Sequence, residues 1–155
     1  MTDHHYTECG LSNVLIHGIT PELDDDGDQV ITIPAVNELH RVIAEGIVLH
    51  DSGISGEELR FLRTEMGMTQ AELARLVHRD KQSVGRWERG EIEIDGAFET
   101  VIRKHAIEKL GLNVDLAIDE LAERSVPSSR TQQIDINALR AANDGGTYYE
   151  LRKVG

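Results

Sequence analysis

The sequence predicts a mainly α-helical fold in which a five-helix domain is flanked by a small N-terminal α+β module and an extended C-terminal tail. Three observations predict it. Helix-capping residues recur at short intervals between residues 55 and 113, and apolar residues repeat there with helical spacing. Residues 1–33 lack that helical periodicity.

The N-terminal module is expected to contain a β-hairpin and one helix. Two apolar runs, 13–18 and 29–33, have the composition of strands, and a polar loop rich in aspartate lies between them. A helix with one apolar stripe is predicted over 35–49. Its stripe consists of Val36, Leu39, Ile43 and Ile47.

The middle of the chain carries clear helix start and stop signals. Ser55 and Glu58 form an S-x-x-E capping box, and Gly67 follows the helix that this box opens. Thr69 and Glu72 form a second capping box. Further N-cap candidates are Asp80, Asp95 and Asn113. Five short helices joined by short links predict an all-helical domain.

The C-terminal segment is expected to be an appendage. Residues 125–133 have a linker composition, 134–136 and 147–154 are candidate strands, and 137–143 is a candidate short helix. The predicted division of the chain is therefore 1–54, 55–124 and 125–155.

The charge of the chain is unevenly distributed. The net charge is -12, which on its own argues against a nucleic-acid partner. However, residues 1–54 contain ten acidic residues and only Arg41 as a base, whereas residues 75–90 contain five basic and two acidic residues. This asymmetry indicates two modules with different partners.

Several classes of protein are disfavoured. Cys9 is the single cysteine, so neither an internal disulfide framework nor a four-cysteine zinc site is expected, and no metal or other cofactor is predicted. The N-terminal apolar run is too short for a signal peptide or membrane span, and we expect a cytoplasmic protein without membrane contact. No catalytic spacing of nucleophile and base occurs, so no enzymatic activity is predicted.

The stretch from residue 69 to residue 90 has the pattern of two helices crossing at a short turn. A small residue, Ala74, stands where the helices would meet, and the link 78–80 has the length of a helix-turn-helix turn. The apolar positions expected to face inward are Leu73, Val77, Val84 and Trp87.

Once those positions are buried, the outward face of the second helix is polar and basic. Its side chains are of the kinds that read bases and bind phosphates. We therefore predict contacts to double-stranded operator DNA by Thr69, Gln70, Arg79, Lys81, Gln82, Ser83 and Arg86.

The string T-Q-x-E-L-A followed by S-V-x-R-W-E-R-G resembles the lambda-repressor-like, or XRE-type, helix-turn-helix family over residues 55–122. The resemblance implies a five-helix fold, DNA binding and an ion pair between Arg63 and Glu88. Two positions depart from the family pattern. His78 stands where glycine is usual and can adopt the left-handed conformation at some cost. Arg79 stands where an apolar residue is usual, so either its stem covers the core while its head reaches phosphate, or the turn is reshaped.

A weaker resemblance concerns the N-terminal layout, which is similar to that of MqsA/YgiT-type antitoxins. Those proteins place a zinc module with two C-x-x-C pairs before a helix-turn-helix domain. Here one pair is reduced to Cys9 and Ser12, and the second is absent. The zinc site is therefore not expected, and apolar packing would replace it.

These observations predict a homodimeric transcriptional regulator that represses a promoter, which we expect to be its own. The acidic module 1–54 suits capture of a basic toxin protein, which would make the chain the antitoxin of a toxin–antitoxin pair. The alternative is a ligand- or metal-sensing regulator with no toxin partner.

Overall fold

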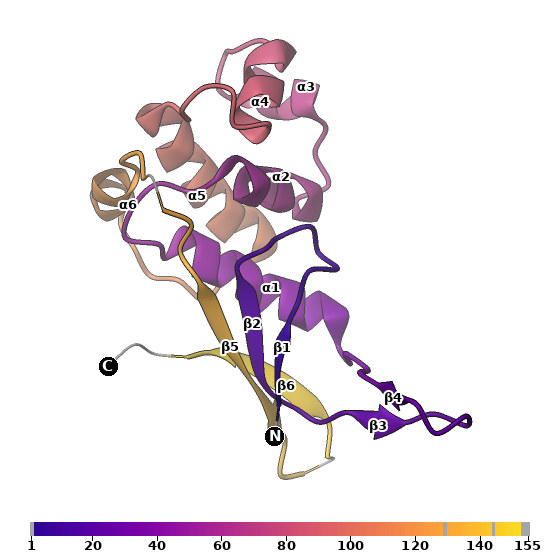
Figure 1. Cartoon of the computed structure of the whole chain (residues 1–155). Helices are drawn as coiled ribbons and strands as arrows, with labels where there is room; N and C mark the ends of the chain where they lie inside the picture. The colour runs from indigo at the N-terminus through magenta and orange to yellow at the C-terminus, as the bar shows by residue number, and fades with distance from the viewer. Residues whose placement is uncertain (1, 129, 144, 153–155) are drawn as a thin grey trace. The chain divides into compact units, whose positions relative to one another are not determined.

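The computed structural model describes residues 2–128, 130–143 and 145–152, and these form six helices and two small sheets (Figure 1). The chain divides into two compact units. Unit 1 comprises the described residues of 1–43 and 133–155, and unit 2 comprises those of 44–132. Helix α1 (Val36–Val48) contains the point at which the chain passes from one unit to the other.

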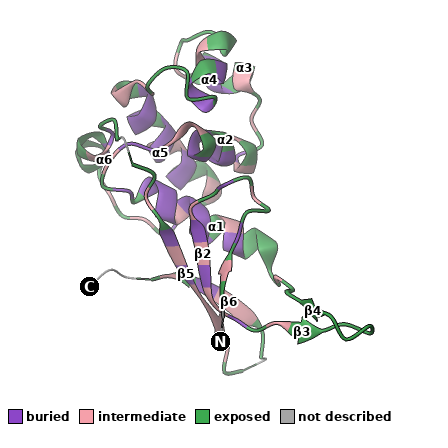
Figure 2. Cartoon of the chain, in the orientation of Figure 1, coloured by how far each residue is buried: buried purple, intermediate pink, exposed green. Residues whose placement is uncertain are grey.

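A four-stranded sheet forms the centre of unit 1. Its strands are β1 (Thr2–His5), β2 (Val14–Ile19), β5 (Ile134–Arg140) and β6 (Thr147–Leu151), in the order β1-β2-β5-β6. Strands β2 and β5 are parallel, and the two outer pairs are antiparallel. The buried side chains of the sheet are mainly those at alternate positions: Val14, Ile16, Ile19, Ile134, Ile136 and Tyr149 (Figure 2).

The C-terminal segment is therefore part of the N-terminal fold. The short helix predicted over 137–143 is wrong, because residues 134–140 continue as one strand with Ile134 and Ile136 buried. The final strand ends at Leu151, and the last two residues predicted for it, Lys153 and Val154, lie outside the described residues.

The predicted hairpin between 13–18 and 29–33 is also wrong. Strand β4 (Gln29–Val30) pairs with β3 (Glu22–Leu23) in a separate two-stranded sheet, and both strands are exposed. The reason is that β5 offers apolar residues at the alternate positions that β2 needs to bury its own, whereas the aspartate-rich segment between β3 and β4 belongs in water.

Unit 2 contains the end of α1 and five further helices: α2 (Gly56–Glu65), α3 (Gln70–Leu76), α4 (Lys81–Glu88), α5 (Gly96–Leu110) and α6 (Ile118–Arg124). The starts of the first four of these follow the predicted caps. Both predicted capping boxes are present, and Asp80 and Asp95 cap α4 and α5. The predicted Asn113 cap is wrong, because α6 begins five residues later. Its first turn is instead closed by the backbone N–H of Ala117, which donates to Glu120.

A buried arginine connects the helices of unit 2. Arg103 of α5 has no exposed surface, and its guanidinium pairs with Glu99 at 2.8 Å. Its remaining donors reach backbone carbonyl oxygens before α2 and at the end of α6, namely those of Val48, His50, Ser52 and Arg124. A buried charge is tolerated only when it is paired and fully hydrogen-bonded, as here.

The observed division differs from the one expected from the sequence. The boundary lies within α1 rather than near residue 54, and the segment 133–152 joins unit 1 instead of forming an appendage. Among the residues that the structure describes, none of the helices is long and apolar enough to cross a membrane.

Candidate nucleic-acid interface

Three of the four apolar positions predicted to face inward from α3 and α4 are buried, whereas Val77, at the C-terminal end of α3, is only half-buried. Leu73 and Val84 have no exposed surface, and Trp87 is 2% exposed. The ring of Trp87 stacks against Phe98 of α5 with centroids 4.2 Å apart. Ala74, also buried, provides the small contact between the two helices. This packing fixes which face of α4 points to solvent.

The turn between α3 and α4 is closed without a glycine. His78 has φ of 56°, so it adopts the left-handed conformation usual for glycine at this position. The backbone N–H of Arg79 donates to the carbonyl of Ala74 at 2.9 Å, which closes the C-terminal end of α3. Asp80 then accepts from the N–H of Ser83 at 2.7 Å and starts α4.

The cap at Asp80 stays charged at neutral pH. Hydrogen bonds from the side chain and the backbone of Ser83 lower the pKa of this carboxyl. A charged carboxylate at the start of a helix favours the helix dipole. It also places one negative charge at the end of the helix that is expected to approach phosphates.

Three of the predicted contact residues project freely from α4. Lys81, Gln82 and Arg86 are exposed, and their side chains form no hydrogen bond with any other described residue. Ser83 is half-buried beside the cap, and Thr69 is exposed at the start of α3. All five residues therefore lie on α3 and α4 or at their starts. The polar groups of Lys81, Gln82 and Arg86 are available to a ligand, whereas the hydroxyls of Ser83 and Thr69 lie beside the helix caps.

Gln70 is engaged inside the protein. Its amide donates to Glu88 at 3.0 Å rather than projecting toward solvent. Sequence position alone did not reveal this contact, because Glu88 lies 18 residues away. A role of Gln70 at a DNA backbone would require this hydrogen bond to break or to be shared.

Arg79 is likewise partly committed to protein partners. Its guanidinium pairs with Asp95 at 3.1 Å and lies 5.7 Å from the ring centroid of Trp87. The side chain is 48% exposed. Its stem thus covers the core where an apolar residue is usual, while the guanidinium has a partner other than phosphate.

The two residues that the resemblance pairs are in contact. Arg63 of α2 donates to both carboxylate oxygens of Glu88, from Nε at 2.6 Å and from Nη2 at 3.1 Å. It also donates to the carbonyl of Met68 at 3.0 Å. Glu88 is almost fully buried, so this two-pronged pair fastens the C-terminal end of α4 to α2.

Two further clusters were not predicted from the sequence. The Arg103 network of unit 2 holds the segment before α2, and a second cluster in unit 1 places His17 between Asp3 and Asp135 at 2.9 and 2.8 Å. Both join residues far apart in the chain. Among the described residues, no group of three or more histidine, cysteine, aspartate or glutamate side chains is placed to hold a metal ion.

Comparison with known proteins identifies one segment. Residues 59–97 match the family model described as Helix-turn-helix. The match runs from α2 to the start of α5 and includes every predicted contact residue. The chain therefore contains a helix-turn-helix domain, the class of domain through which transcriptional regulators bind DNA.

The match covers well under half of the chain and does not reach the N-terminal strands. The resemblance of residues 1–54 to MqsA/YgiT-type antitoxins thus receives no support from it. Neither the curated proteins nor the solved structures contain a match to this chain.

Proposed function

We propose that the chain is a sequence-specific transcriptional regulator that reads operator DNA with α4 and carries out no catalysis of its own. The observation that supports this is the division of α4 into a buried face with Val84 and Trp87 and a free face with Lys81, Gln82 and Arg86. Arginine and lysine side chains recognise guanine edges or phosphates, and glutamine recognises adenine, when a helix enters the major groove.

We further propose that the regulator acts as a homodimer and represses its own promoter. One recognition helix contacts only a few base pairs, so two copies on half-sites one helical turn apart would supply the missing affinity and specificity. Bound over a promoter, such a dimer would exclude the polymerase.

A gel-shift measurement at fixed salt tests the DNA-binding proposal, with the DNA upstream of the gene as probe. The double variant Gln82→Ala/Arg86→Ala should lose sequence-specific binding. A matched control is Lys109→Ala, which removes an exposed basic side chain at the end of α5. Unchanged operator binding by the double variant would overturn the proposal.

A protein partner is a second proposal, and the β3–β4 hairpin favours it. Leu23 is 71% exposed, Val30 and Ile31 are about 40% exposed, and four exposed aspartates lie between the strands. An isolated two-stranded hairpin is marginally stable in water. The combination of apolar and acidic side chains suits a basic protein, such as the toxin of a toxin–antitoxin pair.

Co-expression with the product of the adjacent gene tests this second proposal. A toxin should inhibit growth alone and be neutralised by the wild-type chain, and Leu23→Ser should weaken neutralisation. If no complex forms and growth is not rescued, the regulator has no toxin partner of this kind. The alternative would then be a regulator that senses a ligand or a metal. Metal analysis of the purified chain would test whether it binds a metal.

A further inference from the structure

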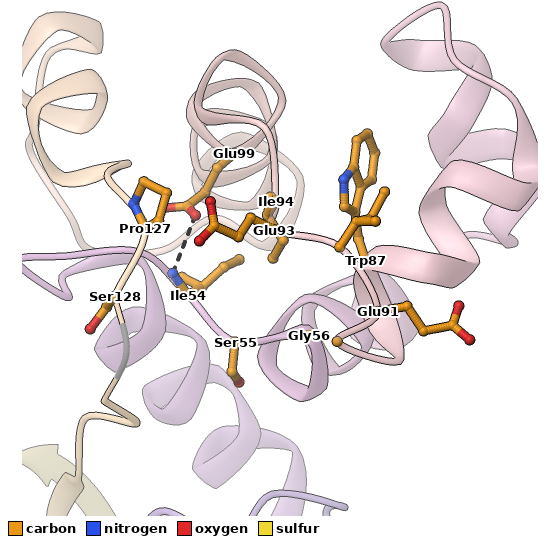
Figure 3. A pocket seen from close by; sticks show the side chains of 12 residues that line it. Ile54, Ser55, Gly56, Trp87, Glu91, Glu93, Ile94, Glu99, Pro127 and Ser128 are labelled. Carbon is orange, nitrogen blue, oxygen red and sulfur yellow. Dashed lines mark hydrogen bonds between the residues drawn. The ribbon is translucent and has the colours of Figure 1, made fainter.

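A pocket of about 280 Å³ lies within unit 2, beside the end of the proposed recognition helix. Figure 3 shows it between the start of α2, the C-terminal end of α4, the loop 91–94 and residues 127–128. Its volume is near the lower end of the range of small-molecule sites, roughly 300–1,000 Å³. The pocket is therefore of a size for a small ligand rather than for a nucleotide or a peptide.

The walls of the pocket are fixed by hydrogen bonds. The N–H of Gly53 donates to the carbonyl of Val126 at 2.6 Å, which holds the segment leading to Pro127 against the start of α2. The N–H of Ile54 donates to the carboxylate of Glu99 at 3.2 Å (Figure 3). The N–H of Glu91 donates to the carbonyl of Arg86 and anchors the acidic loop to α4. The site is thus preformed, which lowers the entropic cost of binding.

The lining combines apolar side chains with acidic ones and includes no basic residue. Two of the three carboxylates already have cationic partners. Glu91 pairs with Arg89 at 2.9 Å, and Glu99 pairs with Arg103. The third, Glu93, forms no hydrogen bond or ion pair with any described residue, and Figure 3 shows its carboxylate directed toward that of Glu99. One uncompensated negative charge therefore faces a pocket whose walls are partly apolar and partly polar.

We propose that this pocket binds a small organic monocation, a primary ammonium group on a short apolar body, as an effector. The ammonium would donate to Glu93, and the apolar body would lie against Ile54, Ile94 and Pro127. Such a ligand would touch both the start of α2 and the end of α4. Its binding is independent of the proposed DNA-binding function, whereas its role as effector rests on that function.

Calorimetric titration of the full-length chain with n-pentylammonium tests the site without DNA. Trp87, the single tryptophan of the chain, lines the pocket and provides an emission readout of the same titration. We expect saturable binding by n-pentylammonium and none by 1-pentanol or pentanoate, which share the apolar body but lack the cation. Because Glu93 is exposed, solvent screens its ion pair with the ammonium, and Glu93→Gln should weaken binding about two- to fivefold.

Glu93 is exposed, so its replacement should leave the fold intact, and Glu108→Gln on α5 is the matched control outside the pocket. No binding, equal binding of 1-pentanol, or an unchanged affinity in Glu93→Gln would overturn the site. A second titration with operator DNA bound tests the effector role, because coupling between two sites is reciprocal. An affinity for n-pentylammonium that is the same with and without bound DNA would overturn that role. If the chain does not bind DNA at all, the first titration still tests the ligand site.

Discussion

Arg63 and Glu88 form a two-pronged ion pair that fastens α2 to the C-terminal end of α4, with the shorter of its two hydrogen bonds at 2.6 Å. Glu88 also accepts from the amide of Gln70. The buried carboxylate of Glu88 therefore links α4 to both α2 and α3, and these contacts set the orientation of the exposed face of α4.

We expect Glu88→Ala to destabilise the chain by about 3 kcal/mol, because it leaves the Arg63 guanidinium without its counter-charge in a largely buried site. Urea unfolding followed by Trp87 emission measures this. Glu91→Ala breaks a neighbouring pair whose side chains are more than half exposed, and it should change the free energy of unfolding little. Equal losses in the two variants would contradict the assignment of Glu88 as the central acceptor.

Most helix starts and buried positions of unit 2 could be predicted from the sequence, because they depend on residues only a few positions apart. A capping box involves residues three positions apart, so Ser55 and Thr69 could be read as helix starts from the chain alone. The same holds for the inward positions of α4, which repeat with helical spacing. The prediction for Asn113 failed because its backbone N–H donates to Glu45 of α1, a contact from a distant part of the chain, and the helix begins only at Ile118.

The partners of long side chains could not be predicted in the same way. Sequence position placed Gln70 and Arg79 on the expected face, but it does not say which of several nearby groups each side chain binds. Glu88 binds Gln70 and Asp95 binds Arg79, and both acceptors come from other parts of the fold. The parallel pairing of β2 with β5 was missed for a related reason, since it joins residues 120 positions apart, such as Leu15 and Asp135.

The left-handed residue in the turn before α4 offers a stabilising substitution. His78 carries φ of 56° and is exposed, so its side chain strains the backbone without adding core packing. We expect His78→Gly to raise the free energy of unfolding by about 1 kcal/mol. His78→Ala keeps the strain and should not stabilise the chain. Thermal unfolding of both variants measures the difference, and equal stability of the two would show that the turn is not strained.

Arg79 and Arg86, the two arginines among the predicted DNA contacts, should differ in their effect on the salt dependence of operator binding. Arg86 forms no side-chain hydrogen bond within the described residues, whereas Arg79 pairs with Asp95. Removing one phosphate contact lowers the slope of log K against log salt by about 1. Arg86→Gln should show this reduction and Arg79→Gln a smaller one. A salt titration of operator binding measures both slopes, and the reverse order would show that Arg79 leaves Asp95 when DNA binds.

The stability of unit 1 should depend on pH through His17. The hydrogen bond to Asp135 is the main cause that raises the pKa of His17, with a further contribution from Asp3 and an opposing one from burial. Because the folded pKa lies above the unfolded value of about 6.5, the stabilisation is fully present below that pH. It is lost as the pH rises through the folded pKa.

Hydrogen exchange of the β2 and β5 amides at pH 5.5 and pH 8.5 measures this dependence. Wild-type protection should decrease at the higher pH, and His17→Asn should remove most of the difference. The matched control is His105→Asn, which lies on α5 in unit 2. A pH effect that persists in His17→Asn would assign it to another group.

The C-terminal segment should be required for the fold of unit 1 but not for the helix-turn-helix domain. Strand β5 lies between β2 and β6, so ending the chain after residue 132 leaves β2 paired with β1 alone. Two strands do not form a stable sheet in water, and Val14 and Ile16 would lose the neighbours that bury them. We expect hydrogen-exchange protection to be lost across the strands of residues 2–19.

The helices of unit 2 keep their caps and the Arg103 network, because every partner of Arg103 precedes residue 132. Operator binding per folded domain should therefore persist, and protected N-terminal strands in the shortened chain would show instead that the tail is the appendage its composition predicted.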